Sequence, residues 1–509
     1  MSEGASTYIG QLSDDRRWRW DGTAWRPVGI SLPPWAGFKL RSQATLKALA
    51  GAAAVGLLAD QAIRVGAVGL GATVTIAFAA IALQLAGDLR RLESRLLLAT
   101  AAAFGLWLTA RASPWLIGPD IAVALALLTL AASVAVKGTL MDIGLAEVFA
   151  RGAGAAVNAV AGIGFVSAPI GRVRSRLTAL APVARGLLIA IPIVAVLTAL
   201  FASADPIFAS FLTINFDFNQ VALDVFYVLV GGLAMAGLLR LAATAPVDRV
   251  DGPLWRLGTT EALVVLIGLD IVFATFAIAQ AVGASGTGAA TLRAAGVTYA
   301  DYARSGFFQL LWVAGITLVV LIVFSRITGF AHRAGRIAFV SLSELAIALT
   351  LLVVFVASTR LSLYESAYGF TMLRLYSHLF AGLIAVVFVL LALDLAGVWR
   401  GRRWFVGATS VTALALLMAL NVANPEAIVV ALNTDRAITT HKIDADYLRG
   451  LSSDAAPTLL ESQSRLEPAL AGQVRSVACA GARSYSPSPA AFNLADAAAA
   501  DARHRGCNT

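Results

Sequence analysis

The chain has 509 residues, of which 59% are hydrophobic and only 14% charged, with a formal net charge of +9. Ordinary soluble domains carry about 25% charged residues, so most of this chain needs lipid rather than water as its solvent. The composition excludes a disordered protein, a coiled coil and a secreted disulfide scaffold as the main architecture. The positive charge does not indicate nucleic-acid binding, because most Lys and Arg lie in short loops between apolar segments.

Residues 1–40 are polar and Trp-rich and have neither the apolar core nor the cleavage site of a signal peptide. Within RRWRWDGTAWRPV, Asp21-Gly22 lies between Trp20 and Trp25, which favours a tight turn. The segment resembles the short WDG-x-x-W module found beside membrane segments in many bacterial proteins. Two interpretations stay open: a small element that binds a protein partner, or a Trp/Arg patch that rests on the anionic inner leaflet.

Apolar stretches of about 17–25 residues predict membrane-spanning helices. Eleven occur within residues 41–422, near 45–63, 67–86, 96–112, 116–136, 183–203, 221–241, 260–283, 308–325, 337–357, 376–397 and 404–422. The sequence therefore predicts an all-α fold, a polytopic helix bundle embedded in the lipid bilayer of the cell membrane, with about 11 transmembrane helices.

The distribution of basic residues tests this threading. With a cytoplasmic N-terminus, the segments assigned to the inside carry 25 of the 39 Lys and Arg, the outside loops carry six, and the other eight lie in the tail. Cytoplasmic loops are enriched in Lys and Arg. An odd number of spans therefore places residues 1–40 in the cytoplasm and the tail, residues 423–509, outside the membrane.

Residues 143–168 are fairly apolar but contain Glu147, Arg151 and Asn158. If this stretch crossed the membrane, every later loop would change sides and the basic loops would face outward. We therefore expect a helix that lies in the inner interface and ends near Pro169.

The tail is polar with nearly balanced charge, and it predicts short helices around LRGLSSDAAPTLLESQ and FNLADAAAADAR. Both cysteines of the chain, Cys479 and Cys507, lie in it. On an oxidising face they suggest a disulfide that closes a modest loop, and two unpaired thiols are the alternative.

The sequence contains no P-loop, HExxH, CxxC or GxSxG motif, and its four histidines lie far apart, so we expect neither a cofactor nor a metal site. Two acidic residues lie inside predicted helices: Asp270 near the middle of one and Glu344 about a third of the way into another. A charge at such a position costs roughly 2.5–3.5 kcal/mol. Each residue either takes up a proton or a cation on a translocation route, or is a protonated or hydrogen-bonded carboxyl that locks helices together.

Two predicted outside loops, GVTYADYARSGFFQL (296–310) and TRLSLYESAYGFTMLRLYSH (359–378), form the most coherent candidate binding site, on the same face as the tail. Their candidate residues are Tyr299, Asp301, Tyr302, Arg304, Arg360, Tyr364, Glu365, Tyr368, Arg374 and His378. The spacings of Tyr364 with Tyr368 and of Arg374 with His378 let each pair share a helical face. Arginines beside carboxylates and aromatic rings can hold a phosphate, a carboxylate or a sugar-lipid head group. The alternative is an aromatic belt with ion pairs that only fixes the depth of the protein in the membrane.

TYADYARSGFFQL, LYESAYGFTMLRLY, TEALVVLIGLDIVFATFAIAQ and the start of the tail, NPEAIVVALNTDRA, also carry a resemblance. Over roughly residues 180–500 the chain resembles bacterial polytopic membrane proteins classed as domains of unknown function, of the DUF4173 and DUF4153 type. The resemblance implies a multi-helix inner-membrane protein with the tail attached. It implies no activity, ligand or catalytic residue.

Three hypotheses for the function follow. In the first, the protein is not an enzyme and binds or helps to move a small or lipid-linked solute at its outer face, which the tail partly covers. In the second, it is a scaffold or sensory module that couples the outer tail to a cytoplasmic partner. In the third, it is a membrane-embedded transferase that acts on lipid-linked substrates with Asp301 or Glu365 as the base.

Overall fold

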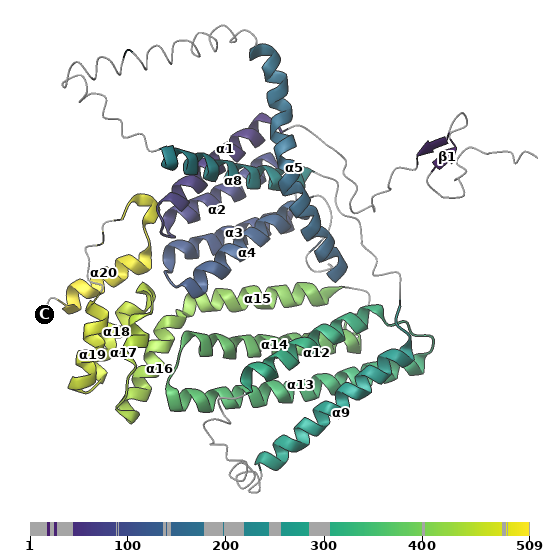
Figure 1. Cartoon of the computed structure of the whole chain (residues 1–509), viewed down its shortest axis with the longest axis vertical. Coiled ribbons are helices and arrows are strands. Elements are labelled where there is room, and N and C mark those ends of the chain that lie inside the picture. Colours follow the sequence, from purple (N-terminus) through teal and green to yellow (C-terminus); the bar gives the residue numbers. More distant parts are fainter. Residues whose placement is uncertain are drawn as a thin grey trace, which may run out of the picture.

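The structure is a computed structural model that describes residues 18–20, 25–27, 44–87, 89, 91–135, 139, 144–177, 197, 218–243, 256–284, 306–399, 403–480, 485 and 487–507. Within these ranges the chain forms an all-α, polytopic membrane helix bundle (Figure 1). Nine of the described helices are long and apolar enough to cross a membrane. They are α1 (Leu46–Arg64), α4 (Pro114–Ser133), α5 (Leu145–Leu177), α8 (Phe218–Ala243), α9 (Thr259–Ala284), α12 (Phe307–Ile327), α13 (Arg333–Tyr368), α14 (Met372–Ala396) and α15 (Trp404–Ala423).

Two shorter or less apolar helices, α2 (Leu70–Ala86) and α3 (Leu92–Ala110), complete the first part of the bundle. Ten of the eleven predicted spans are therefore helices in the structure. The eleventh, near 183–203, lies outside the described residues.

Every second connection lies at the same end of the bundle. The turns at 64–70, 110–114 and 368–372 lie at the end where the tail packs, which we name the tail end. The connections around 87, 134, 257, 328 and 403 lie at the opposite end, which we name the far end. The described helices thus alternate in direction as the sequence predicts.

Helix α5 crosses the far end of the bundle rather than lying parallel to its neighbours (Figure 1). Its Arg151 donates hydrogen bonds to the carbonyl (2.8 Å) and hydroxyl (2.7 Å) of Ser133, at the last turn of α4. Arg240, near the end of α8, donates to Asn158 at 2.8 Å. Arg151 also pairs with Glu147 at 2.7 Å, and both side chains are buried. Arg151 and Asn158 of α5 therefore bind the far ends of α4 and α8.

The prediction that this helix ends near Pro169 is wrong, because α5 continues to Leu177. Proline has no N–H to donate to the carbonyl four residues earlier, which here belongs to Phe165. That carbonyl instead accepts a hydrogen bond from the backbone N–H of Ala44 at 3.1 Å, just before α1 begins. The carbonyl of Phe165 thus receives its hydrogen bond from a donor outside the helix, and the helix can continue past the proline.

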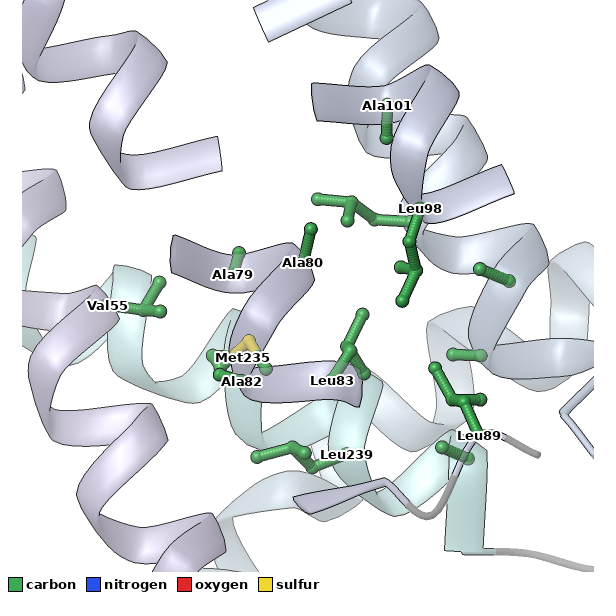
Figure 2. Close-up of a cluster of buried hydrophobic side chains, with 14 of the residues drawn as sticks. Val55, Ala79, Ala80, Ala82, Leu83, Leu89, Leu98, Ala101, Met235 and Leu239 are labelled. Atoms are coloured by element: carbon green, nitrogen blue, oxygen red, sulfur yellow. The ribbon is translucent and has the colours of Figure 1, made fainter. Parts of the chain in front are cut away.

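Among the described residues, the bundle has two large hydrophobic cores and a small cluster of Phe307, Ala357 and Leu361. The first joins α1, α2, α3, α4 and α8, and the second joins α9 with α12–α15. Figure 2 shows part of the first core, where Ala79 and Ala80 of α2 lie between Val55 of α1 and Leu98 of α3. Small side chains let membrane helices approach closely and gain dispersion energy, because burial from lipid supplies little hydrophobic driving force.

The crossing of α1 and α8 depends on glycine. A Cβ atom on Gly231 would lie 2.8 Å from the Cβ of Ala59, and one on Gly232 would lie 3.3 Å from the carbonyl oxygen of Ala52. Larger residues at these positions would push the two backbones apart.

The tail folds into helices with a small core of their own, which includes Val430, Leu459 and Val474. The helices are α16 (Pro425–Thr440), α17 (Ala445–Arg449), α18 (Ala456–Ser462), α19 (Pro468–Cys479) and α20 (Leu494–Cys507). They contact the tail ends of both parts of the bundle: α16 packs on α14 and α15, and α20 packs on α3.

Near the N-terminus, β1 (Trp18–Trp20) pairs antiparallel with β2 (Trp25–Pro27), with Trp20 opposite Trp25. The Asp21-Gly22 turn between them lies outside the described residues. The two strands are consistent with a hairpin, and the likeness to the WDG-x-x-W module stays a prediction.

Candidate functional site

Six of the ten candidate site residues are described, and all six lie at the tail end of α13 and α14. The segment 359–378, expected as a loop, is instead the end of α13, a turn at 369–371 and the start of α14. Gly369 makes this short turn possible because its φ is +88°, a value that a residue with a side chain rarely adopts. The other four candidates, Tyr299, Asp301, Tyr302 and Arg304, lie outside the described residues.

Glu365 and His378 join the two helices. The Nε2 atom of His378 lies 2.9 Å from a carboxylate oxygen of Glu365. The Glu365 side chain is 6% exposed and that of His378 is 27% exposed. The carboxylate is thus shielded from water and orients the imidazole, which is partly exposed. To act as the base of a transferase, Glu365 would first have to break its contact with His378.

Arg374 and two tyrosines extend the cluster. The guanidinium of Arg374 lies over the ring of Tyr364, 4.3 Å from its centroid, and donates to the carbonyl of Gly369. The rings of Tyr364 and Tyr368 lie 4.7 Å apart, so their spacing does place them on one helical face. The guanidinium of Arg374 therefore contacts both the Tyr364 ring and the Gly369 carbonyl.

Arg360 connects this cluster to the segment that carries the first candidate motif. It donates to Gln280 of α9 at 3.3 Å. A Cβ atom on Gly306 would lie 3.0 Å from its guanidinium. Gln280 and Gly306 flank the connection from α9 to α12, which contains residues 296–304. Both ends of that connection therefore lie beside Arg360.

The tail packs on the turn between α13 and α14. The side-chain amide of Asn433 both accepts from the N–H of Phe370 (2.9 Å) and donates to its carbonyl (2.8 Å). Arg436 donates to the last carbonyls of α13, including that of Ala367 at 2.7 Å. The hydroxyl of Tyr447 accepts from the N–H of Met372 at 2.6 Å. The turn that supports the cluster is thus held by three tail residues.

The two intramembrane acids are placed differently. Asp270 is 6% exposed, and neither of its carboxylate oxygens has a hydrogen-bond partner among the described residues. Glu344 is half-buried, and one of its oxygens is likewise without a partner in the described part of the chain. Helices α9 and α13 pack together. The roles expected for Asp270 and Glu344 stay predictions.

The sequence analysis missed a densely bonded group of residues at the tail end. Arg111 donates to the carbonyl of Asn421 at 2.7 Å and to Asp454 at 3.2 Å. The other oxygen of Asp454 accepts from the N–H groups of Ala112 and Ser113, at 2.7 Å each. Asp454 thus satisfies the free donors at the start of α4 and fixes the tail to the α3–α4 turn.

The sequence analysis also missed the pair formed by Asp120 and Asn421. Asp120 of α4 is fully buried and accepts from the amide of Asn421 of α15 at 2.8 Å. The carboxylate inside the apolar segment 116–136 could have been found by the same signal that pointed to Asp270. Its partner could not, because an asparagine near a helix end has no distinctive pattern.

Glu426, at the start of α16, is the buried acid of the tail. It accepts from the N–H and the hydroxyl of Ser452, at 2.7 Å each. Burial raises the pKa of Glu426 above its usual value, and the bonds from Ser452 oppose that shift only in part. The protonated form is therefore favoured in the folded protein relative to a solvated glutamate.

Cys479 and Cys507 are joined by a disulfide in the structure, with their Cα atoms 5.8 Å apart. The bond links the last residues of α19 and α20. Within the described part of the chain, no three His, Cys, Asp or Glu side chains gather as a metal site would require.

Comparison with known proteins adds one finding. The family model of DUF4153, a domain of unknown function, matches residues 96–462. No curated protein matches the chain, and neither does any solved structure. The match runs from α3 through the bundle into α18 and covers more than half of the sequence. The chain therefore belongs to the DUF4153 family of membrane proteins.

Proposed function

We propose that the protein binds, or helps to translocate, a small or lipid-linked solute with an anionic group at the tail end. The position of Arg360 carries this proposal. Its guanidinium is half-buried beside both ends of the 285–305 connection, and Arg374 and His378 add positive or hydrogen-donating groups on the neighbouring helix turns. Guanidinium groups beside aromatic rings suit phosphates and carboxylates.

The proposal places the tail end outside the cytoplasmic membrane and the far end, with residues 1–40, in the cytoplasm. The excess of Lys and Arg in the connections at the far end supports this orientation. The disulfide in the tail supports it too, because such bonds persist in oxidising compartments.

The test is thermal unfolding of the full chain in lipid nanodiscs with three probes: inorganic phosphate, citrate and a polyprenyl phosphate. At least one should raise the unfolding temperature in a saturable way, since a ligand that binds only the folded state stabilises it. Arg360→Gln should weaken that response about tenfold, the size expected for the loss of one charged hydrogen bond. Arg465→Gln is the matched control, because Arg465 is an exposed arginine of the tail that pairs with Asp435 and not with the cluster. A flat response to all three probes contradicts the proposal.

A second candidate, a sensory or scaffold module, is favoured by the contacts of α4. Asp454 of the tail accepts hydrogen bonds from the N–H groups of Ala112 and Ser113, directly before this helix. At its other end, Arg151 of α5 binds the carbonyl and hydroxyl of Ser133. A single helix of 20 residues therefore joins the tail directly to the helix that crosses the far end. In this reading the N-terminal segment or α5 contacts a cytoplasmic protein partner.

Hydrogen exchange on the full chain in nanodiscs tests whether the tail is coupled to α5 through α4. Asp454→Asn weakens the outer contact of α4. If the tail and α5 are coupled, amide exchange within 145–166 should rise several-fold although the substitution lies at the opposite end. The control is Asp446→Asn, which removes an exposed acid of the same tail. Unchanged exchange in α5 after Asp454→Asn would count against the sensory role.

A further inference from the structure

A cavity at the far end of the second core has no part in the functions above. It lies between the last turn of α12, the first turns of α13 and the end of α14, and has a volume of about 410 Å³. A second cavity of about 390 Å³ shares Arg336, Val340 and Leu395 with it. The two cavities adjoin at these three residues, and we refer to them together as the depression.

The first cavity carries an excess of positive charge. Arg326 and Arg336 line it together with Asp394, and Arg333 lines the second cavity. Asp394 pairs with Arg326 at 3.1 Å. Neither Arg333 nor Arg336 has an ion-pair partner among the described residues, and both are exposed. Two guanidinium groups are therefore available to an anion that enters the depression.

Aromatic residues mark the rim. Trp399 is 68% exposed, and its ring packs edge-on against Trp404 at a centroid distance of 5.2 Å. The indole of Trp404 donates to the carbonyl of Val398 at 2.9 Å, which holds the turn after α14. Trp399 has a φ of +53°, a left-handed conformation that costs energy for a residue with a side chain. Tryptophan is enriched at the depth of lipid head groups.

The second cavity has apolar as well as charged lining residues. Besides the arginines and Ser341, it is lined by Ile337, Val340, Leu395 and Ala396. Ile337 is 56% exposed, so an apolar surface adjoins the charged pocket. A free anion would gain nothing from this surface, whereas an acyl chain would.

We propose that this depression binds an anionic phospholipid of the leaflet at the far end. Its phosphate lies between Arg333 and Arg336, the head group lies beside Trp399, and the first part of one acyl chain lies along Ile337 and Leu395. Basic pockets between transmembrane helices suit anionic head groups, each Arg or Lys adding to the attraction. This site is independent of the proposed site at the tail end.

The test is thermal unfolding of the purified full chain in a neutral detergent. Phosphatidylglycerol is titrated in, with phosphatidylcholine of the same acyl chains and inorganic phosphate as comparisons. Phosphatidylglycerol should raise the unfolding temperature saturably, and phosphatidylcholine and phosphate at equal concentration should not. Arg333→Gln and Arg336→Gln should each weaken the apparent affinity about fivefold, the equivalent of about 1 kcal/mol.

Two further variants make the result specific. Arg256→Gln removes an exposed charge from the same end but outside the depression, and it should leave the affinity unchanged. Asp394→Asn removes a carboxylate that lines the depression and should strengthen binding. Equal responses to both lipids, an equal shift with inorganic phosphate, or an equal loss in Arg256→Gln and Arg336→Gln would each overturn the proposal.

Discussion

Arginines at the tail end differ in their partners from two arginines at the far end of the second core. At the tail end, Arg111 is bound by Asp454 and by two backbone carbonyls, and Arg374 is bound by a carbonyl and a tyrosine ring. At the far end of the second core, Arg333 and Arg336 are exposed and have no ion-pair partner among the described residues. Arg111 and Arg374 thus join parts of the protein at the tail end, whereas Arg333 and Arg336 stay exposed at the far end of the second core.

Substitution of Asp454 should cause the largest loss in the free energy of unfolding. The side chain of Asp454 is 1% exposed and that of Arg111 is 17% exposed. Asp454→Ala removes one member of this pair and the acceptor for two N–H groups, so it should lower the free energy of unfolding by about 3–5 kcal/mol. The measurement is unfolding by a denaturing detergent, followed by tryptophan fluorescence.

The matched control is Asp446→Ala in the same tail. Asp446 and Arg449 are 89% and 58% exposed, and such pairs contribute about 0–1 kcal/mol. Equal losses in the two variants would show that the tail end does not depend on its buried pair.

The disulfide comes next. It closes a loop with a sequence separation of 28 residues, for which loop-closure entropy predicts about 3–4 kcal/mol. Replacement of both Cys479 and Cys507 by Ser should lower the thermal stability of the tail by this order. A reducing agent should have the same effect on the native chain and none on the double variant. A membrane-impermeant thiol reagent that labels the chain without reduction would contradict the bond.

Glu426 predicts a pH dependence. Because burial raises its pKa in the folded state, the folded protein keeps the proton at pH values where the unfolded chain has lost it. The stabilisation is therefore complete below the ordinary pKa of 4.5 and is lost as the pH rises through the raised pKa, by at most about 1.4 kcal/mol per pH unit. Glu426→Gln should remove this slope from a plot of unfolding temperature against pH. A slope that persists would assign the effect to another group.

The smallest effect is expected at the far end. Without anionic lipid, Arg333→Gln and Arg336→Gln should change the free energy of unfolding by no more than about 0.5 kcal/mol, the usual range for exposed positions. The same denaturing-detergent titration measures it. A loss as large as that of Asp454→Ala would mean that these arginines also hold the fold, and the contrast between the ends would disappear.

The sequence predicted the bundle well because the signals for spans are long and local. Apolar length places the helices, and basic loops place their ends, so ten spans and the alternation of connections followed from composition alone. The predicted helix ends were wrong where a contact elsewhere in the fold, or a single glycine, outweighed the local sequence pattern. Pro169 does not end α5 because Ala44 supplies the missing donor, and segment 359–378 is helical except for a turn that Gly369 makes possible.

The candidate site was only partly accessible to the same reasoning. The i,i+4 spacing did bring the rings of Tyr364 and Tyr368 together, because a helix fixes that geometry. The pairing of Glu365 with His378, and of Arg111 with Asp454, joins residues on different elements. Such pairs depend on packing over long sequence separations, which spacing along one chain cannot reveal.

The length of α13 links the two ends. Its 36 residues span about 54 Å at 1.5 Å per residue, against a hydrocarbon thickness of about 30 Å. Arg336 lies in its first turn and Glu365 in its last. Since the rod is much longer than the membrane is thick, it must protrude or tilt. Because Arg336 and Glu365 lie at opposite ends of one helix, a tilt of α13 would displace them in opposite directions, so a change in bilayer thickness would alter both ends of the bundle together.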